Sequence, residues 1–401
     1  MTIVLDMRWV GDPPSDVEVY ARELARRIPL LAPSERFSLL FRDADLRDRT
    51  LSDLGIASLP NVRGVVFPYS PASFLGQFFL PIWLRVHHCD VFHSPGATLP
   101  YLAFNGLRRC SAGRAIATIH DADPLLVRNA DGTGARAARR RAFRRATLRG
   151  TIDRSCVVLV PSETLRRDLA SSLRLRGVAL EKFHVIFHGA DALGVGASSP
   201  PPGPSAPLVL YVGRCGPHKQ VPDLVRAFKE VLHRGAANAR LVIVGPEDPN
   251  HPAARRMAES LGIEDHVLFP GLLSPSNLSA LYREAAVVVN PSRYEGSALP
   301  ILEAMAHGAP VVCTDGGAQP EIAGDAARIV PAGDTSALAK SILSVLSDPA
   351  LRRDLAARGL ARAAQFTWDR TAAETLAAYR VVGRKDSTFR RIAMARQGGR
   401  P

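Results

Sequence analysis

The chain has 401 residues, of which 46% are hydrophobic and 6% are aromatic. This length suits two domains of ordinary size, and this apolar content excludes a chain that is disordered throughout. A scattered set of five cysteines without a C-x-x-C pair favours a reducing compartment and argues against a cysteine zinc site. These cysteines are Cys89, Cys110, Cys156, Cys215 and Cys313.

The net charge of +13 is concentrated in two places. Residues 136–150, RAARRRAFRRATLRG, hold seven arginines and no acid, and the chain from Arg380 onward is also basic. Nucleic acid is one candidate partner, but the arginines lack a pattern of interleaved aromatic residues and no known reading module accompanies them. An anionic membrane surface bound through Arg136–Arg149 fits better, because each basic residue adds about 1 kcal/mol near such a surface. A solvated helix is the alternative interpretation.

The N-terminal residues MTIVLDMRWV enter a strand-like run rather than a basic segment with an apolar core, so no secretory signal is expected. No apolar run approaches the roughly 20 residues that span a bilayer. We therefore predict a cytoplasmic protein that attaches peripherally to the inner face of the membrane. The apolar segment FLGQFFLPIWL, residues 74–84, is interpreted as core packing, with a membrane contact as the alternative.

Strand-like runs alternate with helical ones along the chain. In the first half the predicted strands are TIVLDM, FSLLF, VRGVVF, DVFH, RAIATIH and SCVVLVP, with helices such as VEVYARELARRI between them. In the second half they are LVLYVG, ARLVIVG, HVLFPG, AVVVNPS, PVVCTD and ARIVP. This alternation predicts an α/β fold in which parallel sheets are covered by helices on both faces.

A Pro/Gly/Ser-rich segment, GVGASSPPPGPSAP, separates the two halves and is interpreted as a linker. We place the first domain at residues 1–190, the linker at 191–207, the second domain at 208–365 and a basic tail at 382–401. Two doubly wound domains joined in this way are expected to face each other across a cleft, where ligands bind at the carboxyl ends of the strands.

The first candidate site segment in the second domain is YVGRCGPHKQVPDLVRAF, residues 211–228. It is a strand, a turn and an amphipathic helix, with Arg214 and Lys219 on the turn. The turn matches neither G-x-G-x-x-G nor a Walker loop, which argues against the usual dinucleotide and nucleoside-triphosphate sites. Two cations on a loop between a strand and a helix can hold a diphosphate. Ordinary surface charge is the alternative.

The second candidate segment is SRYEGSALPILEAMAHGAP, residues 292–310. A helix is predicted here, because Pro300 suits the first turn, Leu299, Leu302, Met305 and Ala306 form an apolar stripe, and Gly308 suits its end. Glu295 then lies on the preceding loop and Glu303 about one turn into the helix. Both acids border the same helix N-terminus. The alternative is a first-turn acid that offsets the helix dipole, with a solvated acid on the loop.

Along nearly its whole length the chain resembles the retaining family-4-type glycosyltransferases (glycosyl transferases group 1), which have two Rossmann-like domains in the GT-B fold. Within this family it is most similar to bacterial polysaccharide and lipid-linked mannosyltransferases. GRCGPHKQVPDLVRAF resembles the phosphate-binding segment, and YEGSALPILEAMAHGAPVV resembles the E-x7-E signature. First-domain landmarks appear in the same order as in the family: DVFHSPGATLP, ATIHDAD, VPSETLRRDLASSL and FHVIFHGAD. FTWDRTAAETLAAY resembles the terminal helix, here residues 366–381, that crosses back to the first domain.

The resemblance assigns roles to these residues. It implies that Glu303 holds the ribose hydroxyls of a nucleotide-sugar donor and that Glu295 faces the transferred sugar. Arg214 and Lys219 are implied to bind the diphosphate. The remaining implied donor-binding residues are the backbone amides at the helix N-terminus: Gly296, Ser297, Ala298 and Leu299. With this positive charge beside the departing diphosphate, neither a metal nor another cofactor is expected.

The resemblance also implies site residues in the first domain. His120, at the end of the strand RAIATIH, corresponds to a catalytic histidine beside the donor sugar, with a loop or core histidine as the alternative. Gly11 and Asp16 flank the loop that contacts donor or acceptor in the family. Asp121 and Asp123 form a D-x-D pattern that binds metal in other glycosyltransferases, but the same pattern recurs at residues 43–45 and is not interpreted as a metal site.

The chain departs from the family pattern at three places. The signature usually reads E-G-F-G-L-P, whereas Ser297 and Ala298 replace the Phe and the second Gly here. We expect a negative φ at Ala298, because a Cβ is disfavoured at positive φ. The loop before Asp16 contains two prolines, and His188 stands where an Asn is common.

We therefore predict a retaining, metal-independent hexosyltransferase that acts on a glycan or lipid-linked acceptor. Mannose from GDP-mannose is the favoured donor, because the first-domain segments are most similar to mannosyltransferases. A catalytically silent homologue that binds a glycan or acts as a scaffold is the first alternative. A nucleic-acid-binding protein that uses the arginine run is the second.

Overall fold

A computed structural model of the chain describes residues 1–11, 15–71, 73–100, 103–104, 114–122, 134–190, 206–246 and 252–383. The described residues form two compact units. The first unit contains the described residues up to Phe187 together with the C-terminal helix that begins at Trp368, and the second unit contains those from His188 to Thr367. The predicted linker core and the basic tail fall largely on residues 191–205 and 384–401, which lie outside the described residues.

The first unit is built on a seven-stranded parallel sheet with strand order β3-β2-β1-β4-β5-β6-β7. Its strands are β1 (Thr2–Asp6), β2 (Arg36–Phe41), β3 (Val62–Val66), β4 (Val91–Ser94), β5 (Arg114–Thr118), β6 (Val157–Val160) and β7 (Phe183–Val185). Its helices are α1 (Asp16–Leu31), α2 (Ala44–Asp53), α3 (Phe74–Val86), α5 (Ala135–Arg154), α6 (Glu163–Ser172), α7 (Val178–Glu181) and α15 (Trp368–Gly383), with a 3₁₀ turn at Met7–Trp9.

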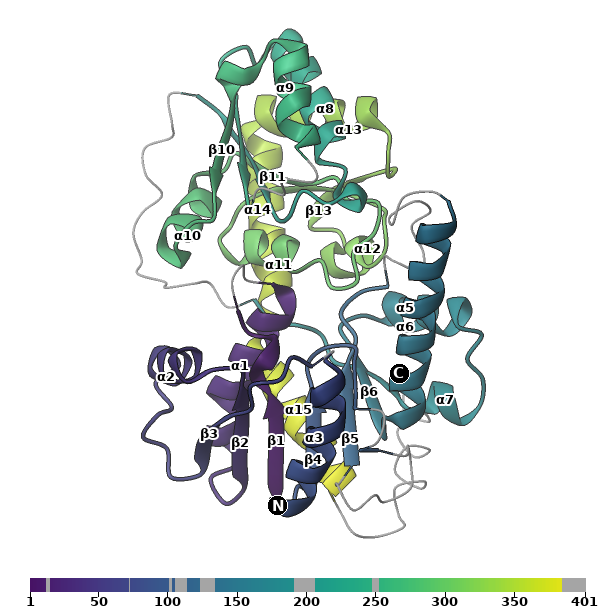
Figure 1. Ribbon diagram of the computed structural model, residues 1–401. Coiled ribbons are helices and arrows are strands. Elements are labelled where there is room, and N and C mark those ends of the chain that lie inside the picture. The colour runs from purple at the N-terminus through teal and green to yellow at the C-terminus, as the bar shows by residue number, and fades with distance from the viewer. Residues whose placement is uncertain are drawn as a thin grey trace, which may run out of the picture. The chain divides into compact units, whose positions relative to one another are not determined.

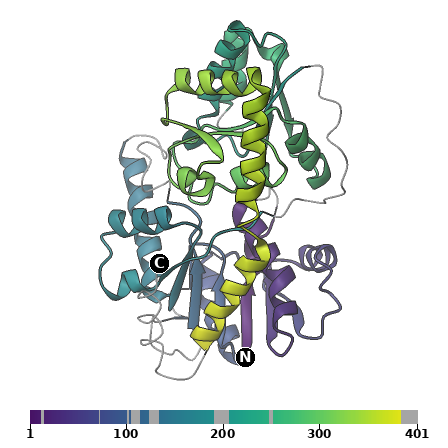
Figure 2. The same ribbon diagram turned by 180° about the vertical axis from the view of Figure 1, so that it is seen from behind.

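The helices cover both faces of this sheet. Strand order runs one way from β1 to β3 and the other way from β4 to β7, so right-handed connections place α1 and α2 on one face and α3 and α5 on the other. Figure 1 shows α3 and α5 on the near side of the sheet. Figure 2, the opposite view, shows α1 and α15 on the other side. Helices on both faces bury every residue of the central strands β4 and β6, including the polar His93 and Ser94 of β4.

A buried polar chain fastens α15 to this sheet. Tyr379 of α15 bonds His93 Nδ1 at 2.6 Å, and His93 Nε2 lies 2.8 Å from Thr118 Oγ1. Burial lowers the pKa of His93 to about 3, so the imidazole is neutral at neutral pH. Thr118 Oγ1 in turn donates to Tyr20 on α1 at 3.1 Å. The terminal helix therefore completes the polar core of the first unit.

The second unit is built on a six-stranded parallel sheet with strand order β10-β9-β8-β11-β12-β13. Its strands are β8 (Leu208–Val212), β9 (Arg240–Val244), β10 (Val267–Gly271), β11 (Val287–Asn290), β12 (Val311–Thr314) and β13 (Ala327–Val330). Its helices are α8 (Val221–His233), α9 (Ala253–Leu261), α10 (Pro275–Glu284), α11 (Leu299–Ala306), α12 (Gln319–Ala323), α13 (Thr335–Ser347) and α14 (Pro349–Ala363), with 3₁₀ turns at Pro217–Lys219 and Glu264–His266.

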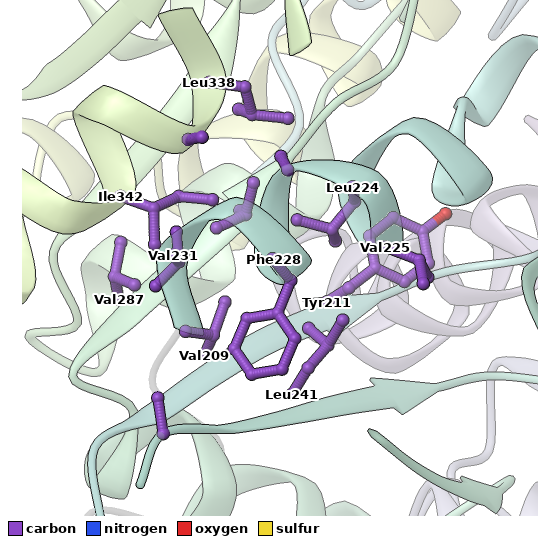
Figure 3. Close-up of a cluster of buried hydrophobic side chains, with 14 of the residues drawn as sticks. Val209, Tyr211, Leu224, Val225, Phe228, Val231, Leu241, Val287, Leu338 and Ile342 are labelled. Atoms are coloured by element: carbon purple, nitrogen blue, oxygen red, sulfur yellow. The ribbon is translucent and has the colours of Figure 1, made fainter. Parts of the chain in front are cut away.

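The amphipathic helix α8 forms the centre of this unit's core. Its apolar residues recur every three or four positions, which gives one buried face. Figure 3 shows the ring of Phe228 over the sheet beside Val209 and Leu241, with Leu338 and Ile342 of α13 in the same cluster. Burying each such side chain contributes about 1.5–3 kcal/mol. The packing of β8 and α8 in this core fixes the two ends of the loop that joins them. That loop carries the predicted site residues Arg214 and Lys219.

Each predicted strand corresponds to a strand in the structure, and the α/β class is confirmed. The prediction of core packing for residues 74–84 is wrong for one face of that segment. It forms helix α3, which buries Gly76, Leu80, Pro81 and Leu84 but exposes its large side chains on the other face. No helix among the described residues is both long and apolar enough to cross a bilayer.

Candidate active site

The predicted site residues of the second unit gather where two neighbouring strands end. β8 and β11 pair in parallel, and the strand order reverses between them, with β9 and β10 on one side and β12 and β13 on the other. In open α/β sheets such a reversal point is where ligands bind, at the carboxyl ends of the strands. The loop after β8 carries Arg214 and Lys219, and the loop after β11 carries Glu295. The Arg293 amide donates to the His218 carbonyl at 2.8 Å, so the two loops are in direct contact.

Lys219 and Glu295 form an ion pair in which the carboxylate is buried and the lysine is half-buried. The Lys219 ammonium donates to both carboxylate oxygens of Glu295, at 2.7 and 2.8 Å. Ser292 Oγ donates to Glu295 Oε1 at 2.6 Å. Glu295 is only 3% exposed, and burial alone would raise its pKa, but the charge and hydrogen bonds of Lys219 and the bond from Ser292 outweigh burial and hold the pKa below its usual value. Glu295 is therefore an ionised carboxylate at neutral pH.

His218 lies beside this pair and stays neutral. Burial, and to a smaller extent the Lys219 charge, lower its pKa to about 4, although the Glu295 charge opposes them. Arg214 is exposed on the same loop, and its carbonyl accepts from the Tyr211 hydroxyl at 2.8 Å. The loop after β8 thus presents the guanidinium of Arg214 and the ammonium of Lys219, while the imidazole of His218 is uncharged.

The Glu295 loop is held in place by the loop after β12, which the sequence analysis did not single out. Gln319 Nε2 donates to the Ser292 carbonyl at 2.9 Å, and the Ala318 amide donates to the Glu295 carbonyl at 2.8 Å. A Cβ at Gly317, where φ is +66°, would lie 2.4 Å from the Glu295 carbonyl oxygen, so only glycine fits there. Two consecutive glycines directly after a predicted strand were the available signal for this support.

The N-terminus of α11 follows the same loop and begins with a left-handed residue. Ala298 is the N-cap, with φ +49° and ψ +38°, and no side chain caps the helix. The expectation of a negative φ at Ala298 is therefore wrong, because the chain turns from a buried loop into the helix within one residue. Gly296, Ser297 and Leu299 are buried around it. Because no side chain caps these backbone groups, the helix end can favour an anion.

The left-handed conformation of Ala298 gives a stability prediction. We expect Ala298→Gly to cost about 2 kcal/mol less unfolding free energy than Ala304→Gly, since glycine relieves left-handed strain at 298 and lowers helix propensity at 304. Ala298 and Ala304 are both fully buried in or beside α11, so the lost methyl contact is matched. Urea unfolding of the two variants measures the difference. Equal costs would show that position 298 carries no strain.

Glu303 lies in α11, as predicted, and is half-buried. Its Oε2 accepts from the hydroxyl of Tyr282 on α10 at 2.8 Å. The Tyr282 ring is fully buried and stacks on His307, with the ring centroids 5.2 Å apart. His307 is itself fixed by bonds to the Glu303 carbonyl at 2.7 Å and to Ser279 Oγ at 3.0 Å. Tyr282, which sequence reasoning missed, therefore orients the Glu303 carboxylate.

The other predicted residues lie in the first unit. His120 lies two residues after the end of β5 and is buried, and its Nε2 donates to the Pro95 carbonyl at 2.7 Å. Burial lowers the pKa of His120 to about 4, so its imidazole is neutral. Asp16 is the first residue of α1, where an acid offsets the helix dipole, and the Gly11 amide donates to Glu18 at 3.3 Å. Asp123, the second acid of the D-x-D pattern, lies outside the described residues.

Comparison with known proteins matches each of the two units to a family model. Residues 17–192, nearly all in the first unit, match the family model described as Glycosyltransferase Family 4, and residues 199–362 of the second unit match the model described as Glycosyl transferases group 1. The two domains are those of the glycosyltransferases. The parallel sheets of seven and six strands are the two Rossmann-like domains of the GT-B fold. The predicted family and fold class are thereby confirmed.

Similar proteins include two kinds of curated relative. The O-antigen chain mannosyltransferase B of Escherichia coli is 34% identical over 173 residues, which cover 43% of this chain and 45% of that protein. The D-inositol 3-phosphate glycosyltransferase of Acidothermus cellulolyticus is 35% identical over 197 residues, covering 46% of this chain and 44% of that protein. The chain thus spans about half the length of the curated relatives it matches.

Among solved structures, Anabaena HepE in complex with UDP-glucose superposes with a TM-score of 0.70 at 18% identity. The match covers 94% of this chain and 100% of that one. At this identity the likeness concerns the fold of the glycosyltransferase domains.

Proposed function

We propose that the protein is a retaining hexosyltransferase that takes a sugar from a nucleoside-diphosphate donor without a metal. The observation that carries the proposal is the grouping of an ionised Glu295, its Lys219 partner, the α11 N-terminus and the oriented Glu303 at the reversal point of one sheet. A nucleoside diphosphate needs this combination: a carboxylate for vicinal hydroxyls, amides and cations for the phosphates, and a second acid toward the sugar.

In this proposal the ribose hydroxyls donate to Glu303, whose carboxylate Tyr282 holds. The diphosphate accepts from the backbone amides around Gly296, Ser297, Ala298 and Leu299. Arg214 and Lys219 lie on the neighbouring loop and supply positive charge to the same diphosphate. The length of α11 between these groups suits one ligand that reaches both. Glu303, assigned to the ribose, lies four residues beyond Leu299, which is about 6 Å along the helix axis from the end assigned to the diphosphate.

The chemistry follows from where charge develops. When the bond between the anomeric carbon and the phosphate oxygen breaks, its electron pair leaves with the diphosphate. The cations and the helix end stabilise that negative charge, which makes a metal ion unnecessary. The anionic Glu295 stabilises the positive charge left at the anomeric carbon. The acceptor oxygen then bonds that carbon, and its proton passes to the departing phosphate.

His120 is proposed to contact the donor sugar from the first domain. Its low pKa keeps it neutral, so it acts through hydrogen bonding rather than through charge. Gly11 and Asp16 belong in the same proposal to the loop at the end of β1 that faces donor or acceptor hydroxyls. An anionic Asp16 suits hydroxyl groups and not phosphate.

The proposed donor is GDP-mannose, which is supported by the first-domain resemblance and by the E. coli mannosyltransferase relative. The proposed acceptor is a growing glycan or a lipid-linked glycan. We further propose a cytoplasmic enzyme held at the inner face of the membrane by the Arg136–Arg149 run of α5. Six of the seven arginines in that run are exposed. Nucleic acid is not a proposed partner.

A thermal-shift panel tests the donor class. GDP, UDP, ADP and their common sugars are each added in EDTA and again with magnesium. We expect one nucleoside diphosphate and its sugar to raise the melting temperature equally in both conditions, and the proposed donor predicts that this is GDP. A shift that requires magnesium contradicts metal independence. No shift with any of the nucleotides would favour the catalytically silent homologue.

A further inference from the structure

Helix α3 of the first unit carries an apolar face that no described segment covers. Its buried face consists of Gly76, Leu80, Pro81 and Leu84. Large side chains on the other face are unusually exposed for a folded domain, in which contiguous apolar surface normally marks an interaction site. They are Phe74 (81%), Leu75 (51%), Phe78 (53%), Phe79 (43%), Ile82 (50%) and Val86 (64%).

This helix cannot rotate to bury those side chains. Leu80 and Leu84 are 1% and 0% exposed, and they pack in one core cluster with Phe92 of β4 and with Phe104. The start of the helix is fixed as well, because Ser73 caps it and a Cβ at Gly76 would lie 2.7 Å from the Ser70 carbonyl oxygen. Turning the helix would exchange a packed face for an exposed one. The outward apolar face is thus a stable feature of the first unit.

The charges on α3 and on α5 indicate what the apolar face of α3 binds. Helix α3 contains no acid, and its one charged residue is Arg85. Helix α5 covers the same face of the same sheet, as Figure 1 shows, and seven of its eight arginines precede its first acid, Asp153. Phe143 is 73% exposed among those arginines. Exposed aromatic and aliphatic side chains on the same side of a sheet as a run of cations suit the boundary between anionic headgroups and acyl chains.

We propose that the outward face of α3 inserts into an anionic bilayer, with the α5 arginines supplying the electrostatic part of the attachment. The face is a single helix of 13 residues, about 20 Å long, so it lies in the interface and does not span the membrane. This inference extends the proposed function, in which a lipid-linked acceptor is met at the membrane, but it rests on the first unit alone. Its failure would leave nucleotide binding by the second unit untouched.

Vesicle co-sedimentation of the full chain tests the insertion. The vesicles contain phosphatidylglycerol with phosphatidylcholine, or phosphatidylcholine alone, at low salt and at about 0.5 M NaCl, where exposed charges are screened. The α3 variant combines Phe74→Ser, Phe78→Ser and Ile82→Ser. Its matched control, Leu268→Ser with Leu272→Ser, removes two side chains of the second unit that are 58% and 50% exposed.

We expect wild type to bind anionic vesicles and to retain part of that binding at high salt. The α3 variant should lose the salt-resistant part, with a partition coefficient lower by about tenfold or more. Replacing Arg139, Arg140, Arg144 and Arg145 with Gln should instead remove the salt-sensitive part, and the matched control should bind as wild type does. The nucleotide thermal shift should be unchanged in each variant, which confirms that the variants fold.

Two results would overturn the inference. Wild-type vesicle binding by the α3 variant at both salt concentrations would show that the face does not insert. Absence of vesicle binding by wild type, together with an oligomeric state that changes in the α3 variant, would show that a second copy of the chain covers the face instead.

Discussion

Lys219→Ala is expected to lower turnover by about 100-fold or more, because it removes a cation from the position where the departing diphosphate gains charge. The same change should cost about 3 kcal/mol of unfolding free energy, since it leaves the buried Glu295 carboxylate without its partner. Steady-state kinetics and urea unfolding measure the two effects. Lys340→Ala, which removes an exposed lysine on α13, is the matched control and should change neither.

A double variant separates catalysis from stability. Lys219→Ala combined with Glu295→Gln removes the uncompensated charge, so stability should largely return while turnover stays low. Full recovery of turnover would contradict the proposed catalytic roles of both Lys219 and Glu295, since the double variant removes both groups. Loss of turnover that simply follows the unfolded fraction would show that the ion pair is only structural.

The ion pair also predicts opposite pH dependences of stability. In wild type the folded-state pKa of Glu295 is lowered, so its contribution is present above the unfolded pKa and is lost as the pH falls through the folded pKa. In Lys219→Ala, burial raises the pKa of Glu295. The unfolding free energy of this variant is therefore reduced at neutral pH, where the carboxylate is charged, and increases as the pH falls and the carboxylate is protonated. Unfolding free energies measured from neutral to acidic pH check the sign. Parallel curves for the two proteins would contradict the assignment.

Glu303→Ala is expected to weaken nucleoside-diphosphate binding by about 10- to 100-fold, since two hydroxyl bonds to a carboxylate are lost. A ligand without the ribose 2′ and 3′ hydroxyls makes the test specific. Wild type should bind this dideoxy ligand as weakly as the variant binds the natural one, and the variant should not distinguish the two ligands. Calorimetric titration measures all four affinities.

Tyr282→Phe should cause a smaller loss of the same kind, a few-fold in affinity, because it removes the bond that orients Glu303 but keeps the buried ring. This loss should also vanish with the dideoxy ligand. Glu259→Ala removes an exposed acid on α9 of the same unit and serves as the control. If Glu303→Ala weakened the binding of the natural and the dideoxy ligand by the same factor, the Glu303 carboxylate would not contact the ribose hydroxyls.

Most of the fold could be predicted because its signal is local. Strands such as VVLV and VVVN are short runs rich in β-branched residues, which suit a sheet buried on both faces. The pairing of Lys219 with Glu295 was not predictable in the same way, because 76 residues separate them and only the order of β8 and β11 brings their loops together. Tyr282, 21 residues before Glu303, is another such contact.

Two local features were also missed, each for a physical reason. Helix α3 has large apolar side chains on both its inward and its outward face, so its sequence does not show which face is buried. The packing of Leu80 and Leu84 decides it. The left-handed φ of Ala298 contradicts the usual preference of residues with a Cβ. A buried loop that must turn directly into α11 overrides that preference.

The central claim is that this chain transfers a sugar from a nucleoside-diphosphate donor. The most direct measurement is the release of nucleoside diphosphate in EDTA from the donor selected by the thermal-shift panel, with a lipid extract as the source of acceptor. The proposal predicts sustained release that requires the extract and falls by about 100-fold or more in Glu295→Gln. Donor binding by wild type without any release above that of Glu295→Gln would contradict it and identify a protein that binds the donor without transferring its sugar.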